Sequence, residues 1–479
     1  MTATIPGPAG HDARPASPSA ASPSVASLST ATPPTVSPPT VSPSVASHPT
    51  PSPAVELGSF AAAVAAAGRA GELVVQPRMG FADIPRMRDG LHRVKQARAR
   101  TVGTLTIDSY TRVGDNDSAR LALADGTDLN GYPIVAHGAD TTRDLVAGLT
   151  GDGFAVQVRH GSANPLGIIR ALLDAGLDAT EGGPVSYCLP YSRTPIRESV
   201  DAWARSCELL ASRPGSHLES FGGCMLGQLC PPSLLVALSV LEGIFFRQHG
   251  LRSVSLSYAQ QTHHDQDVEA LLALRTLAGE HLAGLDWHVV LYTYMGVFPR
   301  TTGGALGLLR DSARLAALTG TERMIVKTPA EAHRIPTIED NIHALEEAAL
   351  AAAAHRGRTP ATGDEFGVLA EARTLVEAVL ELHPDVGRAL TVAFERGILD
   401  VPYCLHADNA QRSRSYIDAR GSLQWHTTGS MPIPALPAPG RDRLRADDLL
   451  GMLSHTQEAF DRAALDQGSE SGDRAALSG

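Results

Sequence analysis

Three arginines stand where short apolar segments of the sequence end, and such segments are typical of the strands of an α/β fold. They are Arg78, Arg112 and Arg159. A guanidinium group binds a carboxylate through two parallel hydrogen bonds, whereas three uncompensated guanidinium charges would repel one another. The pattern therefore predicts a claw for a substrate with two carboxylates. In the alternative interpretation each arginine pairs with a local acid, such as Asp108 or Glu181, and only supports the scaffold.

Acidic and aromatic residues lie close to these arginines in the sequence. His160 follows Arg159, the segment TEGG contains Glu181, and the next apolar segment carries Tyr187 and Tyr191. A carboxylate beside the claw could accept hydrogen bonds from a substrate ammonium group, while tyrosine hydroxyls orient the substrate carboxylates. Together these residues suit an α-amino dicarboxylate. A single glutamate before a strand is also compatible with a purely structural role.

Lys327 is one of only two lysines in the chain and ends the apolar segment RMIVK, with Glu331 one helical turn beyond it. A desolvated lysine at the end of a barrel strand can form a Schiff base with a carbonyl substrate. Two other interpretations remain open. Lys327 could donate to a ligand hydroxyl or ring nitrogen, or it could simply form a salt bridge with Glu331.

Metal ligands are not indicated by the histidines or the cysteines. His263 and His264 are adjacent, so their side chains point in different directions on a helix or a strand and are not expected to share a metal. The five cysteines are scattered and form no C-x-x-C pair, so neither a zinc site nor a disulfide framework is expected.

Strand-like and helix-like segments alternate along most of the chain. The expected strands lie within 73–78, 104–112, 132–138, 154–161, 184–191, 253–259, 288–296 and 323–329. Segments with apolar residues at helical spacing separate several of them, as at 167–176 and 267–282. This alternation predicts parallel βαβ units. Eight strands fit a (β/α)8 (TIM) barrel, in which the site lies at the carboxyl ends of the strands.

The two ends of the chain differ from this pattern. Residues 1–56 hold 13 of the 33 prolines and almost no charge, so a disordered leader is expected there. The barrel domain is expected over 57–338. A C-terminal extension over 339–479 contains helical segments at 339–357, 367–384 and 385–400, followed by a stretch from 403 that looks irregular and ends in a charged amphipathic segment from Arg441 to Asp466.

Composition excludes several classes of protein. The 479 residues carry 40 basic and 51 acidic side chains, a net charge of −11, which argues against a nucleic-acid-binding protein. No segment reaches the roughly 20 apolar residues that a membrane span needs, and no secretory signal precedes the globular part. These features predict a cytoplasmic protein with no nucleic-acid or membrane partner.

A series of ordered motifs carries a resemblance to a known family. From about residue 57 to about residue 434 the chain contains QPRMG, TIDSYTR, LNGYP, RHG, EGG-x-x-SY-x-x-PY, PPS, MG-x-FP, IVKTP-x-EA-x-x-IPT and FE-x-G-x-x-D-x-P. In these it resembles the large (epsilon) subunit of adenosylcobalamin-dependent glutamate mutase, also called methylaspartate mutase. The resemblance implies an isomerase whose TIM barrel covers the upper face of the corrinoid. It would rearrange L-glutamate reversibly to (2S,3S)-3-methylaspartate through radicals formed after cobalt–carbon homolysis.

The resemblance also implies roles for individual residues. Those implied for substrate binding are Arg78, Arg112, Arg159, His160, Glu181, Tyr187 and Tyr191. Glu181 is the one with a catalytic role, as the carboxylate that meets the substrate amino group. Those implied for cofactor contact are Gly80, Asn130, Pro190, Phe298, Lys327, Glu331 and Ile335. In this alignment Lys327 and Glu331 hold the adenosyl ribose, which argues against the Schiff-base interpretation.

The chain departs from the family pattern in places. It contains no D-x-H-x-x-G motif, the motif that supplies the cobalt ligand, so the resemblance implies a separate small cobalamin-binding (sigma) subunit and a complex of two large and two small chains. The segments 258–264, 292–294 and 403–420 match the family poorly, which puts the adenine contacts in doubt. A Schiff-base lyase and a non-catalytic dicarboxylate-binding barrel remain the alternatives.

Overall fold

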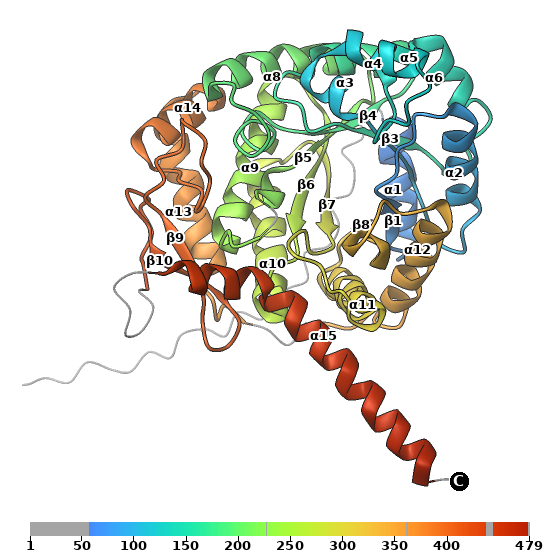
Figure 1. Cartoon of the computed structure of the whole chain (residues 1–479). Helices are drawn as coiled ribbons and strands as arrows, with labels where there is room; N and C mark the ends of the chain where they lie inside the picture. Colours follow the sequence, from blue (N-terminus) through green and yellow to red (C-terminus); the bar gives the residue numbers. More distant parts are fainter. Residues whose placement is uncertain (1–56, 227, 361–362, 437–443, 478–479) are drawn as a thin grey trace, which may run out of the picture. The chain divides into compact units, whose positions relative to one another are not determined.

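Eight parallel strands form the centre of the computed structural model, which describes residues 57–226, 228–360, 363–436 and 444–477 (Figure 1). The strands are β1 (Val74–Pro77), β2 (Gly103–Thr106), β3 (Val156–Arg159), β4 (Ala179–Gly182), β5 (His217–Ser220), β6 (Ser253–Ala259), β7 (Asp286–Tyr292) and β8 (Arg323–Val326). They pair in the order β1-β8-β7-β6-β5-β4-β3-β2. A single bridge between Val75 and Thr101 links β1 to the segment that leads into β2. The predicted (β/α)8 barrel is confirmed.

Helices surround this barrel in the order that its connections require. After β1 to β8 in turn come α2 (Ile84–Gln96), the group α3 (Ser109–Val113), α4 (Asn116–Ala124), α5 (Ile134–His137) and α6 (Ala139–Val146), then α7 (Leu166–Asp174), α8 (Ile196–Ala211), α9 (Pro232–Gln248), α10 (His264–His281), α11 (Thr302–Thr319) and α12 (Ile338–Ala353). Helix α1 (Ser59–Arg69) precedes β1, and its Phe60 is fully buried, with its ring 5.0 Å from the Arg323 guanidinium. Phe60 therefore covers the polar centre of the barrel.

The C-terminal part adds a layer outside the barrel (Figure 1). Helices α13 (Val368–Leu380) and α14 (Val386–Arg396) pack on α9, α10 and α8. Residues 403–413 contain no helix or strand, as expected, and the amphipathic segment forms helix α15 (Ala446–Leu477). An antiparallel pair that was not expected, β9 (Arg414–Ile417) and β10 (Leu423–Thr427), lies between them in the sequence. The division of the chain at residue 338 stays a prediction, and the leader over 1–56 lies outside the described residues.

Two expected strands are wrong, and two strands were missed. The 132–138 segment begins with a hydrogen bond from Tyr132 N–H to the Thr106 carbonyl and then forms one turn of helix, α5, after Pro133. The 184–191 segment forms turns, because its backbone N–H groups are held by a carboxylate and by neighbouring carbonyls. The missed strands, β4 and β5, each carry a glutamate toward the barrel interior.

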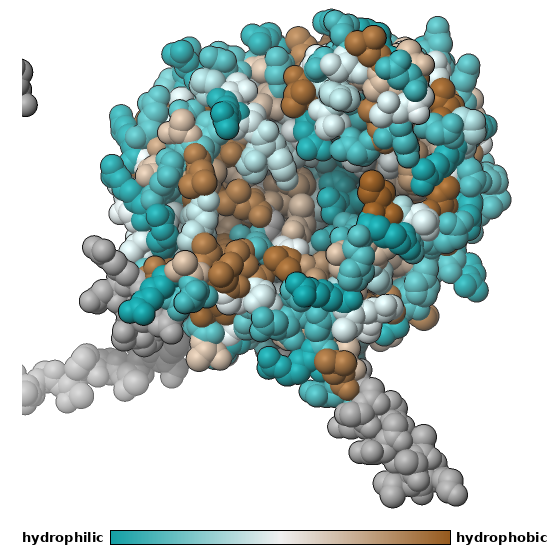
Figure 2. All heavy atoms as spheres, in the orientation of Figure 1, coloured by the Kyte–Doolittle hydropathy of each residue, from teal (hydrophilic) through white to brown (hydrophobic). Residues whose placement is uncertain are grey.

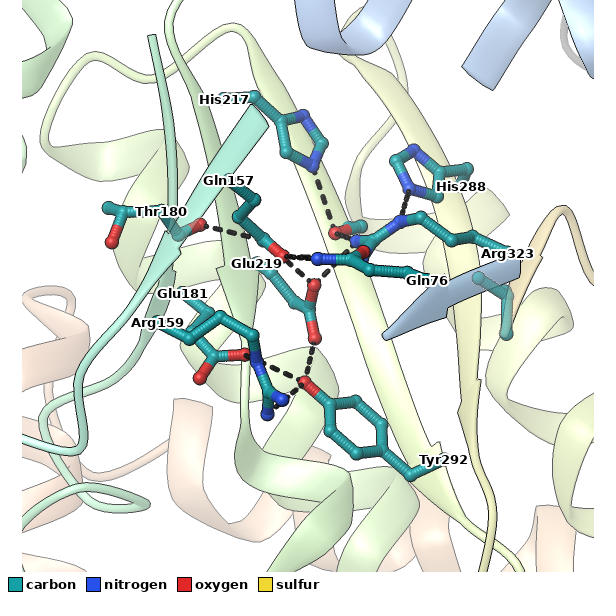
Figure 3. Close-up of polar contacts among 12 residues, drawn as sticks. Gln76, Gln157, Arg159, Thr180, Glu181, His217, Glu219, His288, Tyr292 and Arg323 are labelled. Atoms are coloured by element: carbon teal, nitrogen blue, oxygen red, sulfur yellow. Dashed lines mark hydrogen bonds and ion pairs between the residues drawn. The ribbon is translucent and has the colours of Figure 1, made fainter. Parts of the chain in front are cut away.

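The barrel interior is polar, which explains why β4 and β5 show no apolar pattern. Arg323 and Glu219 are both fully buried and form an ion pair of 2.5 Å. Arg323 also donates to Gln76 and to Ser255, and Gln157 donates to Glu219 at 3.0 Å (Figure 3). Buried charges are tolerated when they are paired and hydrogen-bonded in this way.

Several classes of feature are absent from the described part of the chain. No helix there is long and apolar enough to cross a membrane. No group of three or more histidine, cysteine, aspartate or glutamate side chains there could hold a metal ion. All five cysteines are buried and have free thiols.

Gly80, one of the residues expected to contact a cofactor, lies against β2. A Cβ atom at this position would come within 2.1 Å of the Thr106 carbonyl oxygen, and the Thr106 N–H already donates to the Met79 carbonyl at 3.0 Å. Because the obstructing atoms are backbone, we expect Gly80→Ala to lower the free energy of unfolding by about 3 kcal/mol, measured by urea titration.

Gly167→Ala is the matched control for this prediction. Gly167 is exposed in the first turn of α7, and an added Cβ would meet no atom within 4 Å. Alanine in a helix is favoured over glycine, so this variant should lose no stability. A Gly80→Ala variant as stable as the wild type would show that the backbone can move away from β2.

Candidate active site

A cavity of about 570 Å³ lies at the carboxyl end of the barrel. All seven residues expected to bind substrate line it: Arg78, Arg112, Arg159, His160, Glu181, Tyr187 and Tyr191. Thr106, Gly161, Phe221, Met295, Glu331, Arg334, Ile335 and Pro336 complete the lining. Figure 2 shows a hollow in the face of the molecule seen in Figure 1, with apolar side chains gathered beside it. The seven residues expected to bind substrate therefore come together in space, although up to 113 positions separate them in the sequence.

The three arginines reach this cavity in different states. The guanidinium of Arg78 lies 2.9 Å from the Glu331 carboxylate, and that of Arg159 lies 2.6 Å from the Glu181 carboxylate. Within the described residues Arg112 has no ion pair, and its buried Nε has no hydrogen-bond partner. Two of the three arginines thus pair with acids, and Arg112 is left to bind an anion in the cavity.

The position of Arg112 corrects the sequence interpretation. Strand β2 ends at Thr106, so Arg112 does not end a strand but lies on the short helix α3. The Asp108 carboxylate starts this helix by accepting hydrogen bonds from the N–H groups of Tyr110 and Thr111, at 2.8 and 3.0 Å. Asp108 is therefore the N-cap that places Arg112 over the cavity, rather than its ion-pair partner.

Glu181 lies within β4 rather than before a strand, and its carboxylate is almost completely buried. One oxygen accepts hydrogen bonds from Arg159 Nε at 2.6 Å and from the Tyr292 hydroxyl at 2.8 Å. The other oxygen accepts one from the Tyr187 hydroxyl. Burial and the nearby Glu181 charge raise the pKa of Tyr187 well above its usual range, so its phenol stays a donor. Glu181 is thus held rigidly at the cavity wall.

His160 contributes a neutral donor. Its Nδ1 accepts a hydrogen bond from the Ser162 N–H at 3.0 Å, which assigns the ring proton to Nε2. The buried Nε2 has no hydrogen-bond partner in the described residues. Burial, reinforced by Arg112 and Arg159, lowers the pKa of His160 to about 3, so the ring is uncharged near neutral pH. The structure therefore offers one N–H group to a ligand.

The charges around the cavity favour an anionic ligand. Four arginines face it, Arg334 included, against two glutamates. Since Arg334 pairs with Asp340, the excess positive charge rests mainly on Arg112. An α-amino dicarboxylate matches this set, because its carboxylates can bind guanidinium groups while its ammonium group can bind the Glu181 carboxylate, which keeps room for further hydrogen bonds.

The residues expected to contact a cofactor are placed less uniformly. Glu331 and Ile335 line the cavity, and Ile335 is 70% exposed. Lys327 lies behind Glu331, with its Nζ 4.0 Å from that carboxylate and 4.2 Å from the centre of the Phe298 ring. Burial lowers the pKa of Lys327 to about 8, although Glu331 opposes this change.

Two further residues of this group lie outside the cavity. The Asn130 side chain accepts a hydrogen bond from the Ser109 N–H at 3.0 Å, which supports the start of α3. Pro190 lines a second cavity, of about 500 Å³, between its own loop and residues 403–407. Asn130 therefore supports the helix that carries Arg112, and Pro190 faces a different cavity.

Glu242, which was not anticipated, holds the turn that carries Tyr187. This buried carboxylate on α9 accepts hydrogen bonds from the N–H groups of Val185 and Ser186, at 3.2 and 2.9 Å. It also accepts one from the hydroxyl of Ser186 and one from that of Ser220. A lone acid in the apolar segment 234–246 was the available signal.

Burial raises the pKa of Glu242 to about 7, although its hydrogen bonds oppose this change. The folded protein therefore holds a proton that the unfolded chain, with a carboxyl pKa of about 4.3, releases. Stability from this group is greatest at low pH and is lost as the pH rises through 7.

We expect Glu242→Gln to reduce the loss of unfolding free energy between pH 5.5 and 8 by about 1–3 kcal/mol. The amide fits the site, since the two serine hydroxyls can rotate to accept from it. Urea titrations of both proteins at several pH values measure the difference. Asp267, whose pKa burial also raises to about 7, is present in both proteins and cancels from the comparison. Parallel curves would contradict the prediction.

Comparison with known proteins gives a consistent result. Residues 55–441 match the family model described as methylaspartate mutase E chain. The glutamate mutase epsilon subunit of Halobacterium salinarum is 32% identical over 69% of this chain and 72% of its own length. The Escherichia coli O157:H7 and Desulfitobacterium hafniense proteins of the same name are 29% and 30% identical, over 78% and 75% of this chain and 81% and 78% of their own lengths. The chain therefore belongs to the methylaspartate mutase E chain family.

Proposed function

We propose that this chain is the catalytic subunit of a glutamate mutase, an isomerase that converts L-glutamate to (2S,3S)-3-methylaspartate. The observation that carries the proposal is the Arg112 guanidinium, which has no ion pair in the described residues and shares a cavity with the Glu181 carboxylate. One group is complementary to a carboxylate and the other to an ammonium group. Family membership supports the same reaction class.

In this proposal the chain's own residues bind and orient the substrate. Arg112 binds one substrate carboxylate, and Arg78 and Arg159 bind the other. Glu181 receives the ammonium group, and the His160 Nε2–H donates to a carboxylate oxygen. Tyr187 and Tyr191 complete the wall. Such positioning keeps reactive fragments close together and water away from them.

Residues at the cavity mouth suit adenosylcobalamin. Tyr191 and Ile335 line the cavity and are exposed, so they offer contact area to a flat ring system. The Lys327–Glu331 pair provides a donor and an acceptor for sugar hydroxyls. When bound, adenosylcobalamin supplies the carbon radical that starts such rearrangements. Gly80, Asn130, Pro190 and Phe298 belong to the same proposed contact set.

A small cobalamin-binding subunit completes the proposed enzyme. The chain has no D-x-H-x-x-G motif that could supply the cobalt ligand. The relatives are named as epsilon subunits, which supports a partner chain. We propose a cytoplasmic complex of two large and two small chains.

The test is an assay of the chain mixed with its small subunit, adenosylcobalamin and L-glutamate, coupled to an ammonia-lyase that consumes 3-methylaspartate. Ultraviolet absorbance of the unsaturated product should rise only when all components are present. Glutamate binding without any product would favour the non-catalytic dicarboxylate-binding barrel instead.

A Schiff-base lyase is the second candidate, and the lowered pKa of Lys327 favours it. A lysine with a pKa of about 8 is partly unprotonated near neutral pH and can attack a carbonyl group. Borohydride reduction in the presence of a carbonyl substrate would then leave a stable mass adduct on Lys327. Its absence, with mutase activity present, would eliminate this candidate.

A further inference from the structure

The Tyr292 hydroxyl lies between two buried carboxylates (Figure 3). It is 2.8 Å from Glu181 Oε2 and 2.5 Å from Glu219 Oε1. Glu181 lines the cavity, whereas Glu219 lies deeper in the barrel and is fully buried. Tyr292 is itself almost completely buried at the end of β7. It therefore connects the cavity wall to the polar centre of the barrel.

Each carboxylate has its own guanidinium partner. Arg159 pairs with Glu181 and Arg323 pairs with Glu219, both through contacts of 2.5–2.6 Å. The Arg159 guanidinium also donates to the Tyr292 oxygen at 3.3 Å. Since both ion pairs are already neutral, Tyr292 is not needed to balance charge.

Tyr292 has one hydroxyl proton to donate. Burial raises the pKa of Tyr292 well above its usual range, so the phenol keeps its single proton. A single O–H group points at one acceptor at a time, yet two carboxylate oxygens lie within hydrogen-bond distance. At any moment the hydroxyl therefore donates either to Glu181 or to Glu219.

We propose that Tyr292 is a positioning residue that acts as a two-way donor: it donates to Glu181 and Glu219 in turn when the cavity is empty and to Glu219 alone when a ligand ammonium group binds Glu181. The inference rests on the proposed function, in which Glu181 receives the substrate ammonium. Tyr292 thereby competes with the ligand and moderates the affinity of Glu181 for an ammonium group. The buried Glu219–Arg323 pair provides the alternative acceptor.

Other groups also face Glu181. They are Arg159, Tyr187, Tyr191, Cys224 and, behind Tyr292, Glu219. Tyr187 and Cys224 stay uncharged because burial raises the pKa of each well above its usual range. A variant that lacks the Tyr292 hydroxyl removes this donation and also the long hydrogen bond that the hydroxyl accepts from Arg159 at 3.3 Å. The comparison of two ligands that both carry carboxylates separates the two changes.

Tyr292→Phe is that variant, and Tyr294→Phe is its matched control. The phenyl ring keeps the contact with the Arg159 guanidinium, which lies 5.2 Å from the ring centre. Tyr294 is equally buried and two residues away, but its hydroxyl bonds to Gln228 at 3.0 Å. L-Glutamate and glutarate, which lacks the amino group, are titrated into the full-length chain by calorimetry. The titrations are repeated with the complex carrying methylcobalamin.

One result is expected for Tyr292→Phe. Its preference for glutamate over glutarate should rise about 3- to 10-fold at pH 8, because the competing donor is gone. Tyr294→Phe should leave this preference unchanged.

Three outcomes would overturn the inference. Equal loss of affinity for both ligands would mean that Tyr292 only supports the structure. A selective loss for glutamate would mean that its hydroxyl assists the ammonium instead of competing with it, and an unchanged preference would mean that it does neither. If the wild-type protein binds neither L-glutamate nor glutarate, the proposed substrate itself is wrong. This result is distinct from the three outcomes above, in which the wild type binds its ligands and only the role of Tyr292 is contradicted.

Discussion

An Arg112→Lys variant should lose about 10- to 100-fold in kcat/KM for L-glutamate while it folds as well as the wild type. Arg112 is the one claw arginine without an acidic partner in the described residues, so its guanidinium has only a ligand to bind. Lysine keeps the charge but replaces two parallel donors by a point charge. Stability should not change, because no ion pair is broken.

The kinetic loss should divide between binding and turnover. A misplaced substrate carboxylate shifts the reacting carbon as well, so KM should rise and kcat should fall together. Arg120→Lys is the matched control: Arg120 lies on the neighbouring helix α4 and pairs with Asp117 at the surface. Wild-type kinetics for Arg112→Lys would contradict the claw.

The sequence predicts the barrel because strand-like and helix-like segments alternate along the chain, and this alternation remains visible when single strands are assigned wrongly. Strands β6, β7 and β8 read as apolar segments since their surroundings are apolar on one or both faces. The sequence does not reveal β4 and β5, whose inward side chains belong to the polar centre. The expectation of eight strands came out right only because two false strands replaced two missed ones.

The sequence could identify which residues form the site but not which ion pairs and hydrogen bonds connect them. Position at the end of a strand identifies Arg159, and position directly after one identifies Arg78 and Lys327, since a barrel gathers strand ends at one face. The pairing of Arg78 with Glu331 joins residues 253 positions apart, so no local pattern contains it. Tyr292 could have been found as the last residue of an apolar segment, whereas nothing marks Glu219.

Glu181→Gln is expected to have the largest effect on activity, a fall of about 10²- to 10³-fold in kcat. The proposed substrate ammonium loses its anionic partner, and a neutral amide cannot replace a charge at a buried position. The amide oxygen can still accept from Arg159 or from Tyr187, so the geometry of the cavity should persist.

The same substitution should also lower stability, because it removes the charge that neutralises the buried Arg159 guanidinium. Removing one partner of a buried ion pair costs about 3–5 kcal/mol. We expect a loss at the lower end of this range, because Arg159 can still donate to the amide oxygen and borders the cavity. Urea titration measures this loss, and kcat is then compared at a temperature where both proteins are folded.

Glu280→Gln provides the control for charge removal, since Glu280 pairs with Arg373 at the surface and should leave both quantities almost unchanged. The two effects of Glu181→Gln separate its roles. A stability loss with kcat intact in the folded protein would make Glu181 a scaffold residue whose task is to hold Arg159. A fall in kcat that exceeds any change in KM, at full folding, requires a charge that acts on the bound substrate itself. Glutarate affinity adds the decisive comparison, because a ligand without an ammonium group should bind Glu181→Gln at least as well as it binds the wild type.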